Sequence, residues 1–418
     1  MYIRREIEGM IRKTAESFPC IVIYGPRQVG KSTTVFQLFG DSMPSVTLDD
    51  TDDLSLALNN PKLFLDSYPW PVVIDEIQKA PGLLNEIKKR IDQQRLVWMK
   101  NDEPRQLMYV LTGSNRFELQ EGISESLAGR CGIIEMNSFS QMEKLGRPGH
   151  LFSPDIQILK ESERVDGLPY QTREEIFQGI FDGGMPDIYT GNSKREIYFK
   201  SYMDTYIEKD VRKLISASSE MLFRNFVSLA ALRTGTELHY EELAAGAGID
   251  VKTCKRWLSI LQTSGLIYLL HPYLANLSKR VVKAPKMYFM DTGLCSYLCK
   301  WPTAEMLQNG AMGGAFFETY VISEMIKNLQ AFGKDPREHL YYYRDIDQKE
   351  IDIIFSDADK IYPIEIKKGI SPKKPGKNFK VLEKYQLNQG NALVIDCCDR
   401  IRPLTENVFM YPVFLLGA

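Results

Sequence analysis

The feature that most constrains the fold is a glycine-rich loop between a short apolar run and a helical pattern. The apolar run is CIVIYG at 20–25, and the helical pattern is TTVFQLF at 33–39. The run is too short and too apolar for a surface strand, which predicts a buried parallel strand. The loop matches the pattern GxxxxGK[ST]. It consists of Gly25, Pro26, Arg27, Gln28, Val29, Gly30, Lys31 and Ser32. Strand, loop and helix in this order predict a site for phosphate groups, whereas a chance glycine-rich turn would not need these neighbours.

The residue types of this loop suit phosphate chemistry. Glycine at positions 25 and 30 lets the backbone curl, so that N–H groups and the helix N-terminus point at the phosphates. We expect Lys31 to pair with the β- and γ-phosphate oxygens and Ser32 to ligate Mg²⁺. The sequence therefore predicts binding of ATP with Mg²⁺ by residues 25–33, with Thr33 as the last of them.

A second apolar strand ends in two acids, in the segment PVVIDE at 71–76. We expect Asp75 to belong to the Mg²⁺ shell and Glu76 to polarise the attacking water as a general base. Two acids at this place favour hydrolysis over binding alone. The alternative for Glu76 is that it only caps the next helix.

Two further positions are candidates for the same site. The strand LMYVLTGSN ends in Ser114 and Asn115, which would emerge at the carboxyl edge of the sheet and could orient the lytic water. Arg130, in SESLAGR, precedes the strand CGIIEM and could reach the γ-phosphate bound to a neighbouring subunit, which implies a homo-oligomer. A structural salt bridge is the alternative role of Arg130.

These motifs together resemble the AAA+ superfamily, and more closely the uncharacterised prokaryotic AAA+ ATPases that carry a C-terminal domain of unknown function. The resemblance runs through GPRQVGKST, VVIDEIQ, LTGSN, SLAGR, GGMP, YIEKDVR, KRVVKAPKMYFMDTGL, FFETYV, EIDIIF and PIEIKK, and so covers essentially the whole chain. It implies an ATPase that uses Mg²⁺. The segment Gly183-Gly184-Met185-Pro186 is similar to a lid motif of signalling-type relatives, which implies that Pro186 packs near the adenine.

The chain is too long for one ordinary core, because 418 residues correspond to two to four domains of usual size. We expect an α/β multidomain protein of four units in sequence. They are a P-loop parallel sheet at 1–137, a helical lid or bridge at 138–215, a winged helix at 216–292 and a restriction-endonuclease-like α/β domain at 293–418.

The winged-helix segment offers a candidate DNA-binding surface. Its basic and polar candidates on the recognition helix and the wing are Lys252, Thr253, Lys255, Arg256, Lys279, Arg280, Lys283 and Lys286. Such side chains could contact DNA phosphates. Lys plus Arg is 52 and Asp plus Glu is 54, a net charge of −2, so a DNA site would be a local patch. Packing between domains is the alternative.

The last domain carries a D-(x)n-ExK pattern. Asp352 lies in the strand EIDII, and Glu365 and Lys367 lie on one side of the strand PIEIKK because side chains alternate along a strand. We expect Asp352 and Glu365 to bind Mg²⁺ and Lys367 to stabilise negative charge on a phosphate. Glu318 resembles the additional helical acid of restriction-endonuclease-like folds. The alternative is a solvated edge, or a relic fold used for docking.

The remaining composition narrows the function classes. With 44% hydrophobic and 25% charged residues the chain is a folded protein, and no apolar run is long enough to cross a bilayer, which predicts a cytoplasmic protein without a membrane partner. The seven cysteines are scattered without CxxC and there are four histidines, so no zinc site is expected. Two hypotheses remain: a Mg²⁺-dependent ATPase coupled to a DNA-binding or DNA-cutting half, and an ATP-regulated assembly protein that docks an unknown protein partner.

Overall fold

The computed structural model describes residues 2–114, 126–162, 168–212, 214–215, 219–273, 284–345, 347–369, 376–385 and 387–418. The chain forms two compact units. One contains Tyr2–Ser138 with Thr263–Gly265, and the other contains Phe139–Gln262 with Leu266–Ala418. The first division falls one residue beyond the expected end of the P-loop core. The second compact unit contains the other three expected segments, except for Ser138 and Thr263–Gly265.

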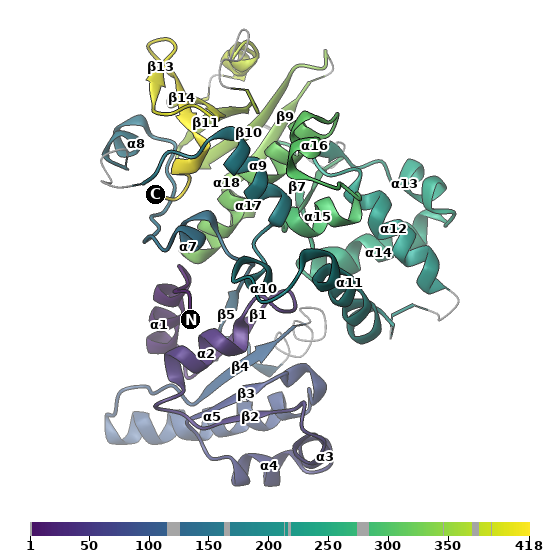
Figure 1. The fold of residues 1–418 in the computed structure, drawn as a ribbon. Helices are drawn as coiled ribbons and strands as arrows, with labels where there is room; N and C mark the ends of the chain where they lie inside the picture. The colour runs from purple at the N-terminus through teal and green to yellow at the C-terminus, as the bar shows by residue number, and fades with distance from the viewer. Residues whose placement is uncertain are drawn as a thin grey trace. The chain divides into compact units, whose positions relative to one another are not determined.

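The first unit is built on a five-stranded sheet in which all pairs are parallel (Figure 1). The strand order is β2-β3-β4-β1-β5. The bounds are β1 Cys20–Tyr24, β2 Ser45–Thr47, β3 Val72–Asp75, β4 Tyr109–Gly113 and β5 Cys131–Glu135. Every residue of β1 and of β4 is buried, which confirms the expected buried parallel strand and explains why its sequence does not alternate.

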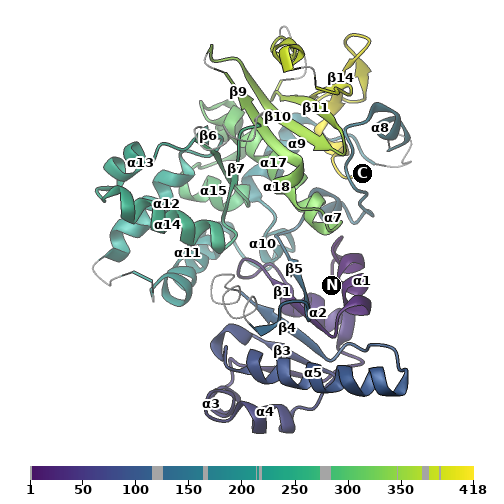
Figure 2. The same ribbon diagram turned by 180° about the vertical axis from the view of Figure 1, so that it is seen from behind.

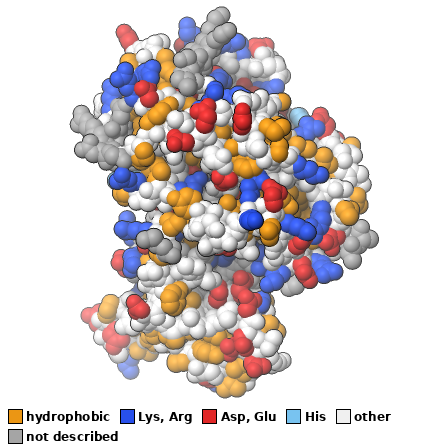
Figure 3. Space-filling model, viewed as in Figure 1, with side chains coloured by type: hydrophobic (Ala, Val, Ile, Leu, Met, Phe, Trp, Pro, Cys, Tyr) orange, Lys and Arg blue, Asp and Glu red, His pale blue; other side chains and the backbone are white. Residues whose placement is uncertain are grey.

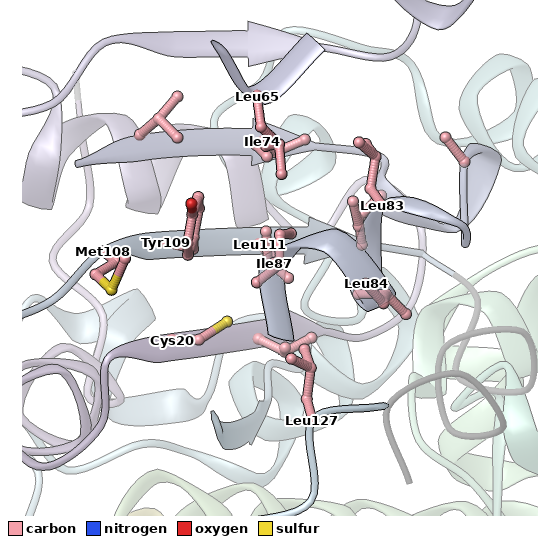
Figure 4. Close-up of a cluster of buried hydrophobic side chains, with 14 of the residues drawn as sticks. Cys20, Leu65, Ile74, Leu83, Leu84, Ile87, Met108, Tyr109, Leu111 and Leu127 are labelled. Carbon is pink, nitrogen blue, oxygen red and sulfur yellow. The ribbon is translucent and has the colours of Figure 1, made fainter. Parts of the chain in front are cut away.

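Helices cover both faces of this sheet. They are α1 Glu8–Ser17, α2 Lys31–Phe39, α3 Thr51–Asn59, α4 Pro61–Ser67 and α5 Leu83–Asn101, with the short helix η1 Ile77–Lys79 after β3. The helix α2 lies in front of the sheet in Figure 1, and α5 lies in front in the reverse view of Figure 2. Ile87 of α5 packs with Leu111 and Ile74 of the strands in one buried cluster (Figure 4). Ile91 of α5 belongs to the same cluster. Burying each such side chain contributes about 1.5–3 kcal/mol, so this face of the sheet is a main source of stability.

The second unit begins with helices, as expected for residues 138–215. They are α7 Gln141–Leu145, α8 Ile156–Ser162, α9 Arg173–Asp182, α10 Pro186–Tyr189, α11 Arg195–Tyr206 and the π-helical turn η2 Ile207–Val211. A three-helix group with a small sheet follows. Its elements are α12 Glu220–Ala231, β6 Thr236–Glu237, α13 Tyr240–Ala247, α14 Val251–Thr263, β7 Ile267–Leu270 and β8 Lys286–Phe289. The three strands are antiparallel in the order β6-β8-β7, so β8 is central.

The C-terminal part of the second unit contains a six-stranded mixed sheet in the order β13-β14-β12-β11-β10-β9. Its helices are α15 Thr292–Leu298, α16 Ala304–Asn309, α17 Gly313–Ala331, α18 Pro336–His339, η5 Phe379–Tyr385 and η6 Val413–Leu415. Its strands are β9 Leu340–Arg344, β10 Glu350–Asp357, β11 Lys360–Ile366, β12 Ala392–Asp396, β13 Arg402–Pro403 and β14 Val408–Pro412. The strands β9, β10 and β11 are antiparallel neighbours, whereas β11 and β12 are parallel. Along the chain the order is α17, α18, the three antiparallel strands, η5, and then β12, β13 and β14.

The GGMP segment has a packing role within this unit. Gly183 has φ of 78°, and a Cβ there would lie 2.5 Å from Asp291 Oδ1 and 2.7 Å from the Gly293 nitrogen. The next N–H, of Gly184, donates to Asp291 Oδ2 at 2.9 Å, while Asp291 Oδ1 caps α15 by accepting from the Leu294 N–H. Small residues are therefore required where this loop meets the start of α15.

Candidate nucleotide-binding site and C-terminal charge cluster

The P-loop connects β1 to α2 by a backbone path that only glycine can follow at two points. Gly25 has φ of 155°, and a Cβ there would lie 2.0 Å from the Met136 carbonyl oxygen. Gly30 has φ of 92° and is the N-cap of α2. Gln28, in between, also has a positive φ of 61°. The loop therefore turns its chain around the N-terminus of α2, and the first-turn N–H groups and the dipole of a helix attract anions.

Lys31 is folded over this loop. It is 7% exposed, and its Nζ donates to the carbonyl oxygens of Gly25 at 3.0 Å and Pro26 at 2.8 Å. The next two residues, Ser32 and Thr33, are exposed on the first turn of α2. The ammonium and the hydroxyls thus lie at the same end of the helix, as the sequence predicts for a phosphate site.

The end of β3 brings an acid to this helix turn. Ser32 Oγ donates to Asp75 Oδ2 at 2.9 Å, and Thr112 Oγ1 of β4 donates to Asp75 Oδ1. A hydroxyl and a carboxylate oxygen are ligands that Mg²⁺ prefers, so Ser32 and Asp75 fit the cation that accompanies ATP. The role of Thr112 was not predicted from sequence, because the motif ends at β3 and the partner comes from the neighbouring strand.

Glu76 has left-handed backbone, with φ of 58°, at the turn after β3. Its Oε2 accepts from Ser114 Oγ at 3.3 Å and from Gln78 Nε2. The Glu76 side chain accepts no capping hydrogen bond from the backbone of η1. The structure therefore does not show the capping role that was the alternative for Glu76. Asn115, the other polar candidate at the end of β4, lies outside the described residues.

Arg130 forms a bidentate pair inside the chain. Its Nε lies 2.7 Å from Asp92 Oδ1 and its Nη2 lies 2.9 Å from Asp92 Oδ2, on α5. The hydrogen bond from Arg130 lowers the pKa of Asp92 below its ordinary value. The structure therefore shows the salt-bridge alternative within one chain, and action on a neighbouring subunit stays a prediction.

Arg5 donates hydrogen bonds to the P-loop and to the segment after β5, a role that was not predicted from the sequence. It is 5% exposed, with Nη1 donating to the Val29 carbonyl at 2.8 Å and Nη2 to the Asn137 carbonyl at 2.7 Å. A buried guanidinium needs such acceptors because an unpaired buried charge is costly. Arg5 thus links the loop to the residues that follow β5.

Each of the C-terminal candidates has a partner within the chain. Glu318 Oε1 on α17 accepts from Lys286 Nζ at 2.9 Å and from Tyr288 OH at 2.6 Å, both on β8. Lys367 Nζ lies 2.9 Å from Glu365 Oε1, which confirms that these two side chains share one side of the strand. Asp352 Oδ2 accepts from the Ile366 N–H at 2.6 Å.

The electrostatics of this cluster are dominated by burial. Burial and then the charge of Glu318 raise the pKa of Asp352 to about 7, against the opposing effect of Lys286 and Lys367. Burial acts to lower the pKa of Lys367, but Asp352 and Glu365 outweigh it and the pKa is raised. The carboxylates therefore lie close enough to affect one another, although each has its own hydrogen-bond partner.

The residues do not fit the divalent cation that the ExK pattern led us to expect. Within the described residues no group of three or more His, Cys, Asp or Glu side chains is arranged to hold a metal ion. The acids Glu318, Asp352 and Glu365 are instead satisfied by Lys286, a backbone N–H and Lys367. The metal-binding role expected of these three acids therefore has no support among the described residues.

Lys286 does not agree with one expectation for the wing. It was a candidate for DNA contact, with packing between domains as the alternative, but it is 2% exposed and pairs with Glu318 and Glu350. The other wing candidates, Lys279, Arg280 and Lys283, lie outside the described residues. On the recognition helix Lys252, Lys255 and Arg256 are exposed, whereas Thr253 Oγ1 donates to Asp250 Oδ2 at 2.6 Å. Basic side chains are interspersed with acidic ones over the face shown in Figure 3.

Comparison with known proteins assigns the first unit. Residues 17–145 match a family described as an AAA domain, so this unit carries a P-loop ATPase domain of the AAA type. Residues 173–305 and 313–416 match two families described as domains of unknown function, DUF8612 and DUF4143. The chain thus combines an AAA-type ATPase domain with a DUF4143 domain, as the motifs led us to expect.

Relatives that match most of the chain occur in two mycobacteria. Uncharacterized proteins of Mycobacterium bovis and Mycobacterium tuberculosis are each 26% identical over 372 residues, which is 88% of this chain and 75% of theirs. Among solved structures, a Walker-type ATPase of Pyrococcus abyssi is 14% identical, with a TM-score of 0.42, and the match covers 71% of this chain and 96% of that one. Cdc6p from Pyrobaculum aerophilum is 14% identical, with a TM-score of 0.24 and coverage of 64% and 89%.

Two expectations stay outside these findings. Pro186 begins α10 in the second compact unit, and its proposed contact with adenine stays a prediction. The homo-oligomer implied by Arg130 is likewise a prediction. No helix among the described residues is both long and apolar enough to span a membrane.

Proposed function

We propose that the first unit hydrolyses ATP with Mg²⁺. The observation that carries this proposal is the hydrogen bond of 2.9 Å between Ser32 Oγ and Asp75 Oδ2 beside the P-loop. Mg²⁺ would supply charge neutralisation for the phosphate oxygens. Ser32 and Asp75 would exchange their mutual hydrogen bond for that ion, and the N–H groups at the start of α2 would bind the phosphates.

Lys31 would change partners when ATP binds. Its hydrogen bonds to the Gly25 and Pro26 carbonyls hold the ammonium at the mouth of the loop. Phosphate oxygens carry full negative charge and form stronger hydrogen bonds to an ammonium than neutral carbonyls do. The ammonium therefore stabilises bound nucleotide and the charge that develops during transfer.

Glu76 is the proposed general base. The hydrogen bonds to Ser114 and Gln78 orient its Oε2 at the carboxyl end of β3 and β4. A carboxylate in that place can accept a proton from water attacking the γ-phosphate. Glu76→Gln keeps the size of the side chain but removes the base, so ATP should still bind while turnover falls at least about a hundredfold.

The matched control for that experiment is Glu16→Gln, an exposed acid on α1. Phosphate release and nucleotide affinity are measured for both variants. Turnover by Glu76→Gln that equals turnover by Glu16→Gln would remove Glu76 from the mechanism.

We propose DNA contact as a second function, supported by the exposed Lys252, Lys255 and Arg256 on α14. The order α12-β6-α13-α14-β7-β8 and the central position of β8 are typical of a winged helix, in which the helix equivalent to α14 enters the major groove. The rival is that this surface docks a protein partner.

Salt-dependent binding separates these two roles. The double change Lys252→Ala and Arg256→Ala should weaken duplex binding in a fluorescence anisotropy titration and reduce the log–log salt slope by about 2, since each phosphate contact contributes about 0.9. The control is the double change Lys194→Ala and Lys200→Ala, which removes two exposed lysines at the start of α11 and within it. Equal effects of the two double variants would favour docking of a protein.

A further inference from the structure

Lys286 is a buried cation at the centre of the C-terminal charge cluster. Its side chain is 3% exposed, and its Nζ pairs with Glu318 at 2.9 Å and also with Glu350. The Tyr342 ring lies 5.6 Å from the same Nζ. Burying an ammonium without partners would cost several kcal/mol, so these contacts are what allow Lys286 to stay charged inside the protein.

The carboxylates are stabilised by this cation, just as they stabilise it. The nearby charge of Glu318 helps to raise the pKa of Asp352, which shows that negative charges are crowded here. Glu350 takes a second partner, Arg344, at 3.6 Å. Lys286 is thus the positive charge that Glu318 and Glu350 share, and Asp352 lies within its field.

The position of Lys286 is fixed by a different sheet from the one that carries Glu350 and Asp352. Lys286 is paired with Leu270 on one side and with Glu237 on the other, because β8 is the central strand of its sheet. The carboxylates come from α17 and β10. The strand β8 therefore holds the ammonium in the cluster. A metal ion could take the place of the ammonium only if the Lys286 side chain moved out of its buried position.

We propose that the Lys286 ammonium takes the place of a divalent metal ion in this cluster, so that Glu318 and Asp352 bind neither Mg²⁺ nor Mn²⁺. A divalent cation needs about six oxygen ligands. It would also meet the Lys286 charge at close range in a site of low dielectric, where like charges repel strongly. The residues of the ExK pattern then keep their places in the fold, and an internal ion pair replaces metal binding.

Metal binding by the full chain tests this proposal. All variants carry Asp75→Asn, which removes the carboxylate expected to hold the Mg²⁺ of ATP, and Mn²⁺ binding is measured by the loss of the free-ion electron paramagnetic resonance signal. The chain with Lys286 present should bind no Mn²⁺ at this cluster. Lys286→Met should create a site, and adding Asp352→Asn should remove it again.

Lys367→Met is the matched control. It removes the other lysine of the cluster, whose Nζ pairs with Glu365, but leaves Lys286 in place. It should therefore gain no Mn²⁺ site. A site gained equally by Lys367→Met and Lys286→Met would overturn the assignment to Lys286.

Loss of the buried partner could also unfold the Lys286→Met chain, so two further measurements keep the proposal testable. Mn²⁺ should restore folding of Lys286→Met, seen as a rise in its melting temperature, because the metal replaces the missing charge. In the chain that retains Lys286, Mn²⁺ binding that disappears with Asp352→Asn overturns the proposal, and absence of binding supports it whether or not Lys286→Met folds. A folded Lys286→Met chain without a Mn²⁺ site also overturns it.

Discussion

Ser32 and Asp75, which lie 43 residues apart in the sequence, are joined by a hydrogen bond of 2.9 Å at the carboxyl end of the parallel sheet. The strand order explains this contact. β1 leads into the P-loop, β4 lies next to β1, and β3 lies next to β4, so the ends of all three strands meet at one edge. A phosphate-binding loop and an acid far away in the sequence therefore form one site.

Lys31→Ala should abolish measurable ATP binding. The change removes an ammonium that can form two or more charge-assisted hydrogen bonds to phosphate, each contributing about 1.5–3 kcal/mol. A fluorescent ATP analogue titrated into the protein gives the affinity, with Lys13→Ala, an exposed lysine on α1, as the control. Unchanged affinity in Lys31→Ala would contradict the role of the P-loop.

Arg5→Ala should weaken ATP binding by at least about tenfold, since it removes a charged donor from the Val29 carbonyl and lets the loop change shape. The KM for ATP should rise more than kcat falls, because Arg5 positions the loop and touches no reacting atom. Arg4→Ala, at a neighbouring side chain that is 89% exposed, is the control. Arg5→Lys should recover part of the affinity. A fall in kcat with unchanged KM would show that Arg5 has another role.

The sequence predicted candidate residues for the nucleotide site where they belong to local motifs. Gly25, Gly30, Lys31 and Asp75 became candidates because a strand, a tight turn and a helix leave a recognisable pattern of residue types. Thr112 and Arg5 were missed, because they contribute through contacts between distant segments, and neither a threonine in a strand nor an arginine near a helix has a distinctive pattern.

In the C-terminal cluster the sequence placed two residues correctly and left the role of a third one open. Glu365 and Lys367 were correctly placed on one side of a strand by alternation. Lys286 was assigned to the wing as a candidate for DNA contact, with packing between domains as the alternative. Its burial depends on α17 and β10 packing against β8, and those contacts follow from tertiary structure that the local pattern does not encode.

Arg130→Ala should reduce ATP turnover by about a thousandfold or more if the guanidinium acts on a neighbouring subunit, the usual effect of removing such an arginine. Its pair with Asp92 is partly exposed and contributes only about 0–1 kcal/mol to stability, so the melting temperature should change little. Turnover is measured for Arg130→Ala, for Lys31→Ala and for a mixture of the two.

Recovery of activity in that mixture would require a site shared by two chains. Asp92→Ala provides the comparison, because it breaks the same pair but leaves the arginine available. If Asp92→Ala and Arg130→Ala lower turnover equally and the mixture recovers nothing, the pair is a local structural contact.

Asp352 should make the protein less stable as the pH rises toward neutrality. Burial and Glu318 raise its pKa from the ordinary 3.8 to about 7, so the folded chain holds a proton that the unfolded chain has lost between those values. Stability rises with pH only where the unfolded state binds more protons, and here the folded state binds more. The contribution of this group therefore decreases as the pH goes from about 4 to about 7 and is constant above that.

Asp352→Asn isolates this contribution. The amide oxygen can still accept from the Ile366 N–H but carries no charge, so the variant should gain stability relative to the original chain on going from pH 5 to pH 8. Urea unfolding at both pH values gives the two differences, and titration of other groups largely cancels between the chains. The charges of Glu318, Lys286 and Lys367 act on this carboxyl group, so Glu318→Gln should lower the pKa of Asp352 and reduce the effect. A difference between the chains that does not depend on pH would mean that Asp352 is ionised throughout this range.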